Sequence, residues 1–258
     1  MTEAEARTSR ISIVIPVLNE ATNIVAALEA LAPLHARGTE IIVVDGGSVD
    51  DTTALAKPHA DFVIASARGR ALQMNAGVAI ARGDVSLFLH VDTRLPEGAD
   101  RLVLEGLARS KRAWGRFDVT IEGAHPLLPV VAAAMNLRSR LTGISTGDQA
   151  MFVARAAFDT AGGFPEIALM EDITLARNLK HISRPLCLTA RVTTSGRRWQ
   201  KRGVLRTIFL MWRLRLAYFF GAAPDDLARR YGYAPIPPPQ GQGGCERSEQ
   251  SGGVRPPA

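Results

Sequence analysis

Short apolar runs alternate with amphipathic segments along the first ninety residues. The runs are rich in β-branched residues and too short for helices, which is typical of strands buried on both faces of a parallel sheet. They cover residues 11–17, 40–45, 61–65 and 84–89. The segments between them have helical spacing, as in Ile24, Leu28 and Leu31 before Pro33, and again over residues 70–82. This order predicts an α/β fold with right-handed crossovers.

The second half of the chain is less regular. Strands are expected over residues 114–121, 150–153 and 185–194, and helices from near Pro96 and over residues 126–141, 171–180 and 204–220. From Pro235 onwards, Pro, Gly, Gln and Ser dominate, which is typical of disorder. We therefore expect one domain over residues 11–220, with halves at 11–96 and 97–220, and disordered segments at 1–10 and 233–258.

The composition fits a folded domain with anionic partners. A hydrophobic fraction of 47% over 258 residues is enough for a full core, and the net charge of +6 favours nucleotide phosphates or acidic lipid head groups. The basic residues form no aromatic–basic pattern, so nucleic acid is not an expected partner. Two cysteines, Cys187 and Cys245, provide neither a disulfide framework nor a zinc site, as expected in a reducing cytosol. The N-terminus does not resemble a signal peptide.

Two apolar segments were tested as membrane spans. Residues 124–141 contain prolines together with Arg138 and Arg140, and residues 204–220 contain Arg206, Arg213 and Arg215. These charges argue against a transmembrane helix in either segment. The second segment, with its flanking cations, instead suggests loose attachment to an anionic membrane face. We expect a cytoplasmic protein with peripheral contact at the inner face of the cell membrane.

Four carboxylates follow expected strands or turns: Asp45, Asp92, Glu171 and Asp172. Asp92 lies near the end of the run Asp84–Thr93, and the apolar part of this run is typical of a buried strand. Ligands of open α/β sheets bind at the carboxyl ends of the strands, so Asp45 and Asp92 can face one crevice. A carboxylate there can bind a divalent metal, and another can act as a general base. The alternative is that Asp92 caps the helix beginning near Pro96.

Several motifs, in this order and spacing, resemble family 2 glycosyltransferases of the GT-A fold. They are residues 14–20 (VIPVLNE), 44–52 (VDGGSVDDT), 69–77 (GRALQMNAG), 88–93 (FLHVDT), 147–150 (GDQA), 162–164 (GGF) and 171–172 (ED). The resemblance covers roughly residues 11–220 and implies a mixed, mostly parallel sheet flanked by helices. Within the family, the chain is most similar to a short bacterial subgroup found near radical-enzyme and selenium-associated genes.

The resemblance implies a role for each matching position. The nucleotide pocket would contain Pro16, Asn19, Glu20, Asp45, Arg70 and His90. Asp92 would bind the metal as the second acid of the Asp-x-Asp motif, and Asp172 would be the catalytic base with Glu171 beside it. Arg198 and Trp199 resemble the end of the family's Gln-x-x-Arg-Trp motif near the acceptor and diphosphate. Asp148 would either contact the sugar or orient its loop.

Two positions depart from the family pattern. His90 replaces the first acid of Asp-x-Asp, and it would either contact the ligand or be a hydrogen-bonded histidine at the strand end. A nitrogen ligand there would favour Mn²⁺ over Mg²⁺. Ser195 replaces the glutamine of the last motif, which argues against processive polymer synthesis and for a single transfer.

The sequence therefore predicts metal-dependent transfer of a sugar from a nucleotide-diphosphate donor, UDP-linked by family resemblance, to a hydroxyl of a small or lipid acceptor, with inversion. One alternative is a sugar-phosphate nucleotidyltransferase, although residues 17–20 lack the glycine- and lysine-rich loop of that class. Another is a non-catalytic nucleotide-binding module, suggested by His90 and Ser195. A dehydrogenase is disfavoured because no Gly-x-Gly-x-x-Gly follows the first strand.

Overall fold

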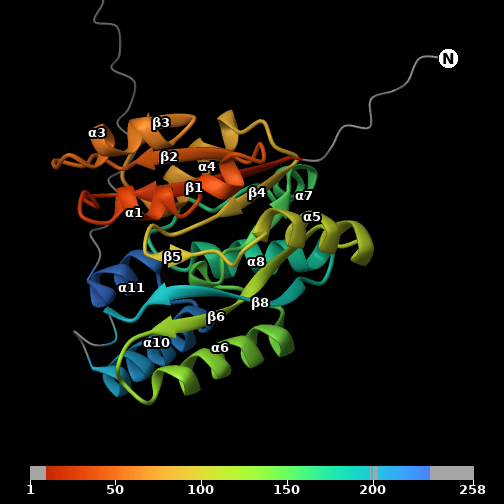
Figure 1. The fold of residues 1–258 in the computed structure, drawn as a ribbon. Helices are drawn as coiled ribbons and strands as arrows, with labels where there is room; N and C mark the ends of the chain where they lie inside the picture. The colour runs from red at the N-terminus through yellow and green to blue at the C-terminus, as the bar shows by residue number, and fades with distance from the viewer. Residues whose placement is uncertain (1–9, 198, 200–202, 233–258) are drawn as a thin grey trace, which may run out of the picture.

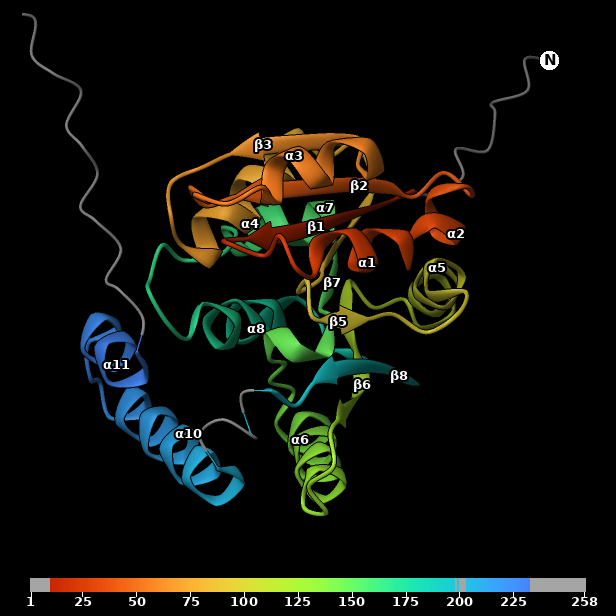
Figure 2. The same cartoon turned by 60° about the vertical axis from the view of Figure 1, so that its left-hand side comes forward.

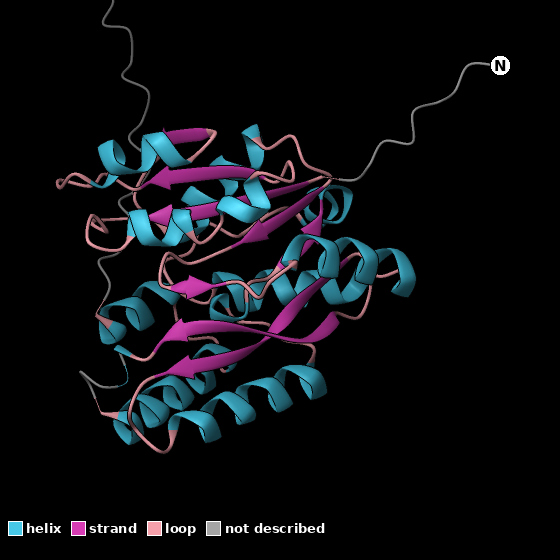
Figure 3. Ribbon diagram, in the orientation of Figure 1, coloured by secondary structure: helices cyan, strands magenta, loops and turns pink. Residues whose placement is uncertain are grey.

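One sheet of eight strands runs through the part of the chain described by the computed structural model, which comprises residues 10–197, 199 and 203–232. Helices lie on both sides of this sheet (Figures 1 and 3). The strand order is β3-β2-β1-β4-β7-β6-β8-β5. The segments expected to be disordered lie outside the described residues, apart from Arg10, whose backbone N–H donates to Asp84 at 3.2 Å.

The two halves of the sheet differ in strand direction. The first half is parallel and consists of β1 (Ile11–Val17), β2 (Glu40–Asp45), β3 (Phe62–Ala65) and β4 (Val85–Phe88). The second half contains β5 (Thr93–Arg94), β6 (Trp114–Glu122), β7 (Phe152–Ala154) and β8 (Leu186–Ser195). β7 joins the halves because it pairs antiparallel with both β4 and β6. β8 is parallel to β6 and antiparallel to β5.

Alternate residues of the parallel strands face two separate cores. In β1, Ile13 and Ile15 point to one face and Val14 to the other, as the two-residue period of a strand requires. The first core receives α1 (Ile24–Glu29), α2 (Ala32–His35), α3 (Thr52–Ala56), α5 (Ala99–Ser110) and α6 (Leu128–Thr142). The second receives α4 (Arg70–Ile80), α7 (Arg155–Ala161) and α8 (Glu171–Ile182).

Three polar or small residues of α4 fix this helix to the parallel strands and to the loop before α8. Nε2 of Gln73 donates to the carbonyl oxygens of Val17 and Val44, both at 2.8 Å, and so bridges the ends of β1 and β2. The side-chain amide of Asn75 exchanges two hydrogen bonds with the backbone of Phe164. A Cβ at Gly77 would lie 2.4 Å from Cγ1 of Val14, so only glycine allows this close helix–strand contact.

Two C-terminal helices, α10 (Val204–Phe219) and α11 (Pro224–Tyr231), form a third apolar cluster with residues 168–173 at the start of α8. Thr174 of α8 and Tyr218 of α10 add a hydrogen bond of 2.6 Å between their hydroxyl oxygens. Figure 2 shows α10 and α11 at the end of the molecule that also carries α6. Among the described residues, no helix combines the length and apolarity that a membrane span requires.

The elements follow the predicted order, with four differences. Pro33 does not end the first helical segment; it occupies the first turn of α2, where its missing N–H costs nothing. β5 was not expected, because two residues show no periodicity, and no element was expected over residues 221–232, where α11 lies. Asp92 does not cap the following helix, since α5 begins after Gly98 without a side-chain cap.

Candidate functional site

A cavity of about 440 Å³ lies between the end of β1, the loop after β4, and the helices α6 and α10. Small-molecule sites are commonly concave pockets of about 300–1,000 Å³, so this volume suits a ligand. Seven of the predicted site residues line it: Pro16, Glu20, Arg70, His90, Asp92, Asp148 and Trp199. Arg198 lies outside the described residues, and Asn19, Asp45, Glu171 and Asp172 are not among the residues that line the cavity.

Asp92 reaches the cavity because its segment is fixed to the end of β8. The backbone N–H of Ser195 donates to the carbonyl oxygen of Asp92 at 3.1 Å, and the hydroxyls of Thr93 and Thr194 are hydrogen-bonded at 3.0 Å. The Asp92 carboxylate itself is exposed, and Thr93 Oγ1 lies 3.5 Å from it. Thus Asp92 keeps most of its acceptor capacity for a ligand.

His90, Gly147 and Asp172 are packed against one another. Gly147 opens the short 3₁₀ helix η2 (Gly147–Gln149), and its N–H donates to Oδ2 of Asp172 at 2.8 Å. A Cβ at Gly147 would lie 2.5 Å from Cε1 of His90, so the imidazole covers this glycine directly. Nδ1 of His90 also lies 3.6 Å from Oδ1 of Asp148. Segments 90–92, 147–148 and 171–172, distant in sequence, therefore meet at one point.

Glu171 is buried behind the cavity at the first turn of α8. Burial and the neighbouring charge of Asp172 raise the pKa of its carboxyl group, Arg70 acts in the opposite direction, and the net pKa is about 7. Glu171 therefore holds a proton to higher pH than an ordinary glutamate does, directly beside Asp172.

Asp45 and Asn19 both bind the loop that follows β2. The Asp45 carboxylate accepts hydrogen bonds from the N–H groups of Gly47 and Ser48 and from the Ser48 hydroxyl. The Ser48 Oγ in turn accepts the N–H of Asn19 at 2.8 Å, and Asn19 Oδ1 accepts the N–H of Val49 at 2.9 Å. Asn19 has the left-handed backbone conformation (φ +53°) that asparagine tolerates. Both residues thus shape the wall next to Pro16 and Glu20.

Glu20 is held at the cavity by the start of α3. Its N–H donates to Thr52 Oγ1 at 2.8 Å, and its carboxylate accepts the amide of Asn23 at 2.6 Å. Asp50 accepts from the N–H of Thr52 at 3.1 Å and from its hydroxyl, and the hydroxyl bond holds the pKa of Asp50 below its usual value. Asp50, therefore, stabilises the loop that orients Glu20.

Two arginines in the cavity lining were missed as site residues. Arg138 of α6 and Arg215 of α10 both line the cavity. Each arginine is a charge within an apolar helical segment, which argues against a membrane span. The sequence does not show that the two helices lie opposite each other, so it does not bring the two charges together.

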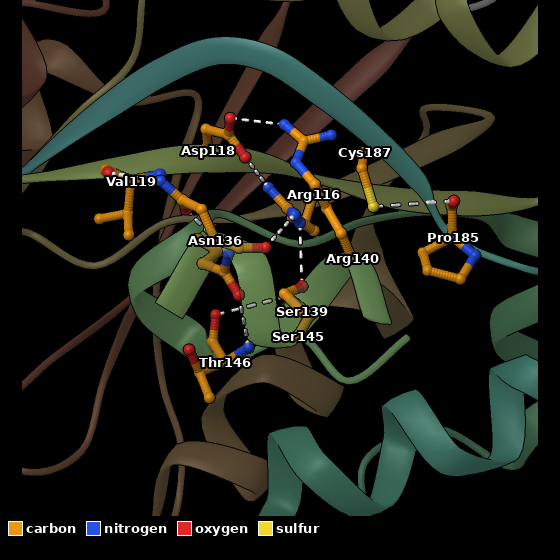
Figure 4. A network of polar contacts seen from close by, with 11 residues as sticks. Arg116, Asp118, Val119, Asn136, Ser139, Arg140, Ser145, Thr146, Pro185 and Cys187 are labelled. Atoms are coloured by element: carbon orange, nitrogen blue, oxygen red, sulfur yellow. Dashed lines mark hydrogen bonds and ion pairs between the residues drawn. The ribbon is translucent and has the colours of Figure 1, made fainter. Parts of the chain in front are cut away.

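A buried polar network fixes α6 on β6 (Figure 4). Arg116 is fully buried, and it donates to Ser139 Oγ at 3.0 Å, to the Asn136 carbonyl at 3.2 Å and to Asp118. Asp118 also accepts a hydrogen bond from Arg140 at 2.5 Å. These residues occupy the side of α6 that faces β6, which leaves Arg138 to face the cavity.

The donor set fits a divalent cation held mainly by a bound diphosphate. No group of three or more His, Cys, Asp or Glu side chains with metal-ligand spacing occurs within the described ranges. Mg²⁺ and Mn²⁺ at nucleotide sites use one or two carboxylates and take their other ligands from phosphate and water. Asp92, exposed toward the cavity, provides such a carboxylate.

Comparison with known proteins adds a family match. The family model described as Glycosyl transferase family 2 matches residues 12–155, which is more than half of the chain. This range contains β1 to β7 and ends before α8, β8 and the two C-terminal helices. A search of the curated proteins found no match.

Solved structures share the fold at low sequence identity. Residues 1–349 of S. aureus TarS align with a TM-score of 0.59 and 16% identity over 86% of this chain and 68% of that chain; in its complex with UDP-GlcNAc the alignment spans 58% of that chain. The mannosyltransferase PcManGT from Pyrobaculum calidifontis, in complex with GDP-Man and Mn²⁺, aligns with a TM-score of 0.58 and 19% identity over 86% and 69%. Glucosyl-3-phosphoglycerate synthase from Mycobacterium tuberculosis, with Mn²⁺, UDP and phosphoglyceric acid, aligns with a TM-score of 0.51 and 19% identity over 72% and 70%. The expected GT-A type of fold is confirmed.

Proposed function

Because the chain belongs to glycosyl transferase family 2, we propose that it transfers a sugar from a nucleotide-diphosphate donor to the hydroxyl of a small or lipid acceptor. The observation that carries this proposal is the cavity in which Asp92, Arg70 and Glu20 of the parallel half meet Asp148 of the second half. A donor and an acceptor must bind side by side for direct transfer, and this cavity spans both halves.

The parallel half provides the donor side. Pro16 and Glu20 follow β1, and the loop that contains Asp45 and Asn19 forms the adjoining wall, which suits a base and a ribose. Arg70 begins α4, where its positive charge and the helix N-terminus both favour a diphosphate. UDP is our first choice of nucleotide, and GDP is the second because the solved structure of PcManGT contains GDP-Man.

The second half provides the group that activates the acceptor. Oδ2 of Asp172 is oriented by the Gly147 N–H, next to the cavity-lining Asp148. In the proposed reaction, the acceptor oxygen attacks the anomeric carbon, Asp172 takes the hydroxyl proton, and the bond to the diphosphate oxygen breaks. A direct displacement of this kind inverts the configuration at the anomeric carbon.

A divalent cation, Mn²⁺ or Mg²⁺, would neutralise the charge that develops on the departing diphosphate. Asp92 would hold this cation, with His90 close to the same region. The side chains of Arg70 and Glu20 would then orient the donor around it. Mn²⁺ or Mg²⁺ in solved structures of similar fold supports this choice.

The test is a calorimetric titration of UDP and GDP, with and without Mn²⁺, on the unaltered protein and on Asp92→Ala. We expect metal-dependent binding that is lost in the variant. Binding that needs no metal in either protein would remove Asp92 from the proposal. If neither nucleotide binds, the chain is better described as a non-catalytic relative of the family.

The same function includes a peripheral contact with an anionic membrane. One side of α10 carries large apolar side chains that are exposed, and the helix also presents the exposed cations Arg206 and Arg213. The apolar residues are Leu205, Phe209, Trp212, Leu216 and Phe219. Co-sedimentation with phosphatidylglycerol vesicles tests this contact. Equal recovery in the supernatant with and without vesicles would refute it, and Phe219→Ser with Phe220→Ser should weaken a real contact.

A further inference from the structure

The cavity contains two buried cationic groups whose donors lack partners. Nε and Nη2 of Arg138, and Nε of Arg215, are buried and have no hydrogen-bond acceptor among the described residues. A buried donor without an acceptor destabilises a protein, and a buried charge without a partner does so more strongly. The missing acceptor is therefore expected to come from a ligand.

Arg116 shows how this chain treats a buried arginine that has only a structural role. It lies within the network of Figure 4, and acceptors from Ser139, Asp118 and Asn136 surround its guanidinium group. Arg138 is two residues from Asn136 on the same helix, but it faces the cavity instead of this network. Arg116 thus finds its hydrogen-bond acceptors within the protein, whereas Nε and Nη2 of Arg138 require an acceptor from a ligand.

The two cavity arginines also raise the positive potential at their position. Burial and the nearby charge of Arg215 lower the pKa of Arg138, Asp172 and Asp148 act in the opposite direction, and the net pKa is about 10. With a pKa of about 10, Arg138 is still charged at neutral pH. An anion bound between the arginines would relieve both the repulsion and the unpaired donors.

Apolar residues of the same two helices line the remainder of this region. From α6 come Val130, Val131, Ala134 and Met135, and from α10 come Ile208, Met211 and Trp212. α10 packs against α11 and the start of α8, and its N-terminal part joins the first core through Val204 and Ile208. Val130, at 62% exposure, and Trp212, at 73%, lie at the rim. The site thus combines a cationic interior with an apolar channel that leads to the surface.

We propose that the acceptor is an anionic amphiphile whose phosphate or carboxylate head binds Arg138 and Arg215 and whose apolar tail lies between α6 and α10. This inference rests on the proposed function, because it assigns the acceptor of the same transfer. Arginine pairs bind phosphate and carboxylate oxygens through parallel N–H donors, and methylene groups fit the apolar walls. The acceptor hydroxyl would then lie near Asp172, whose charge is already felt by Arg138.

The donor diphosphate is the competing anion, and the position of the arginines argues against it. Arg70, at the start of α4 in the parallel half, already provides a cation on the donor side. Arg138 and Arg215 belong to α6 and α10, whose other cavity-lining residues are mostly apolar. Binding measurements separate these two anions directly.

The experiment measures binding of n-decyl phosphate and decanoate below their critical micelle concentrations. n-Decanol is the control that has the tail without the anionic head, and inorganic phosphate is the control that has the head without the tail. Fluorescence is a suitable signal because Trp199 and Trp212 line the cavity, and calorimetry gives a second signal. We expect the better of the two anionic amphiphiles to bind at least tenfold more tightly than either decanol or phosphate. Equal binding of that amphiphile and decanol would overturn the proposal.

Matched variants locate the site. Arg138→Gln and Arg215→Gln should each weaken binding of the anionic amphiphile at least tenfold and leave decanol within twofold. Arg213→Gln is the control, because Arg213 is on the same helix but outside this cavity. An equal loss in Arg213→Gln would assign binding to the exposed cations of α10 and overturn the proposal.

Titration of UDP with Mn²⁺ on the same variants separates failure of this inference from failure of the proposed function. Loss of UDP binding in Arg138→Gln and Arg215→Gln, with amphiphile binding intact, would assign the arginines to the donor and refute the inference alone. Absence of UDP and GDP binding in the unaltered protein would refute the proposed function, whereas the amphiphile result would still report on the arginines.

Discussion

The N–H of Gly147 donates to Oδ2 of Asp172 at 2.8 Å, and the imidazole of His90 covers the same glycine. One small residue therefore joins the segment after β4 to the first turn of α8. Because neither contact leaves space for a side chain at residue 147, the position of the proposed base depends on the absence of a Cβ at this position.

Gly147→Ala should lower turnover at least tenfold. The new Cβ would lie 2.5 Å from Cε1 of His90, so the ring must move away from Asp148 or the Asp172 hydrogen bond must lengthen. Donor hydrolysis and the melting temperature measure the effect. In a His90→Ala background the same change should cost much less stability, because the clash is gone. Equal costs in both backgrounds would show that the contact is unimportant.

Asp172→Asn should reduce turnover by a factor of about 10²–10⁴, the usual contribution of a general base. The amide oxygen can still accept the Gly147 N–H, and only the acceptor for the Ile173 N–H is lost, so the affinity for UDP with Mn²⁺ should be unchanged. Turnover and nucleotide affinity are measured in parallel. A variant with normal turnover would exclude Asp172 as the base.

Glu171→Gln should become more stable relative to the unaltered protein as the pH rises from about 4.5 to about 7. The pKa of Glu171 is raised from 4.5 to about 7, so the folded state binds an additional proton in this window and the unaltered protein loses stability as the pH rises through it. The amide does not titrate, and the difference should level off above the window at about 3 kcal/mol. Urea unfolding at several pH values measures it.

The control for this pH dependence is Glu105→Gln, an exposed glutamate paired with Arg109. Its unfolding curves should parallel those of the unaltered protein at every pH. Parallel curves for Glu171→Gln as well would show that Glu171 titrates normally.

Arg116→Met should destabilise the fold by about 3–5 kcal/mol, because it leaves the buried Asp118 carboxylate with one cationic partner fewer. Arg94→Met provides the comparison, since Arg94 and Glu122 form an exposed pair worth less than about 1 kcal/mol. Urea denaturation at neutral pH measures both. Similar losses would mean that the Arg116 network adds little to the attachment of α6.

The parallel half of the fold was predictable from sequence because its strands are continuous apolar runs. β1, for example, coincides with the predicted residues 11–17. The predicted secondary structure was wrong where the sequence has no local periodicity or where tertiary packing outweighs it. β5 has two residues and exists only because Thr93 and Arg94 pair with β8, and the first turn of α2 accommodates Pro33.

The position of Asp92 and His90 at the cavity was predictable because both residues follow the end of a strand. The roles of Asp45 and Asn19 in joining two loops were not predictable, since their partners depend on how the segments meet. Arg138 and Arg215 were visible as charges in apolar segments. The sequence did not show that both arginines line the same cavity, because this depends on the packing of α10 against α8 and α11.

Gln73 and Gly77 use their amide and their small size on the parallel strands, and Asn75 binds the backbone of Phe164. These three positions of the motif maintain the scaffold and do not select a ligand. Specificity can then diverge by exchange of the C-terminal helices while the scaffold stays intact. A hybrid that joins residues 1–167 to the C-terminal helices of a relative would inherit its donor from one parent and its acceptor from the other.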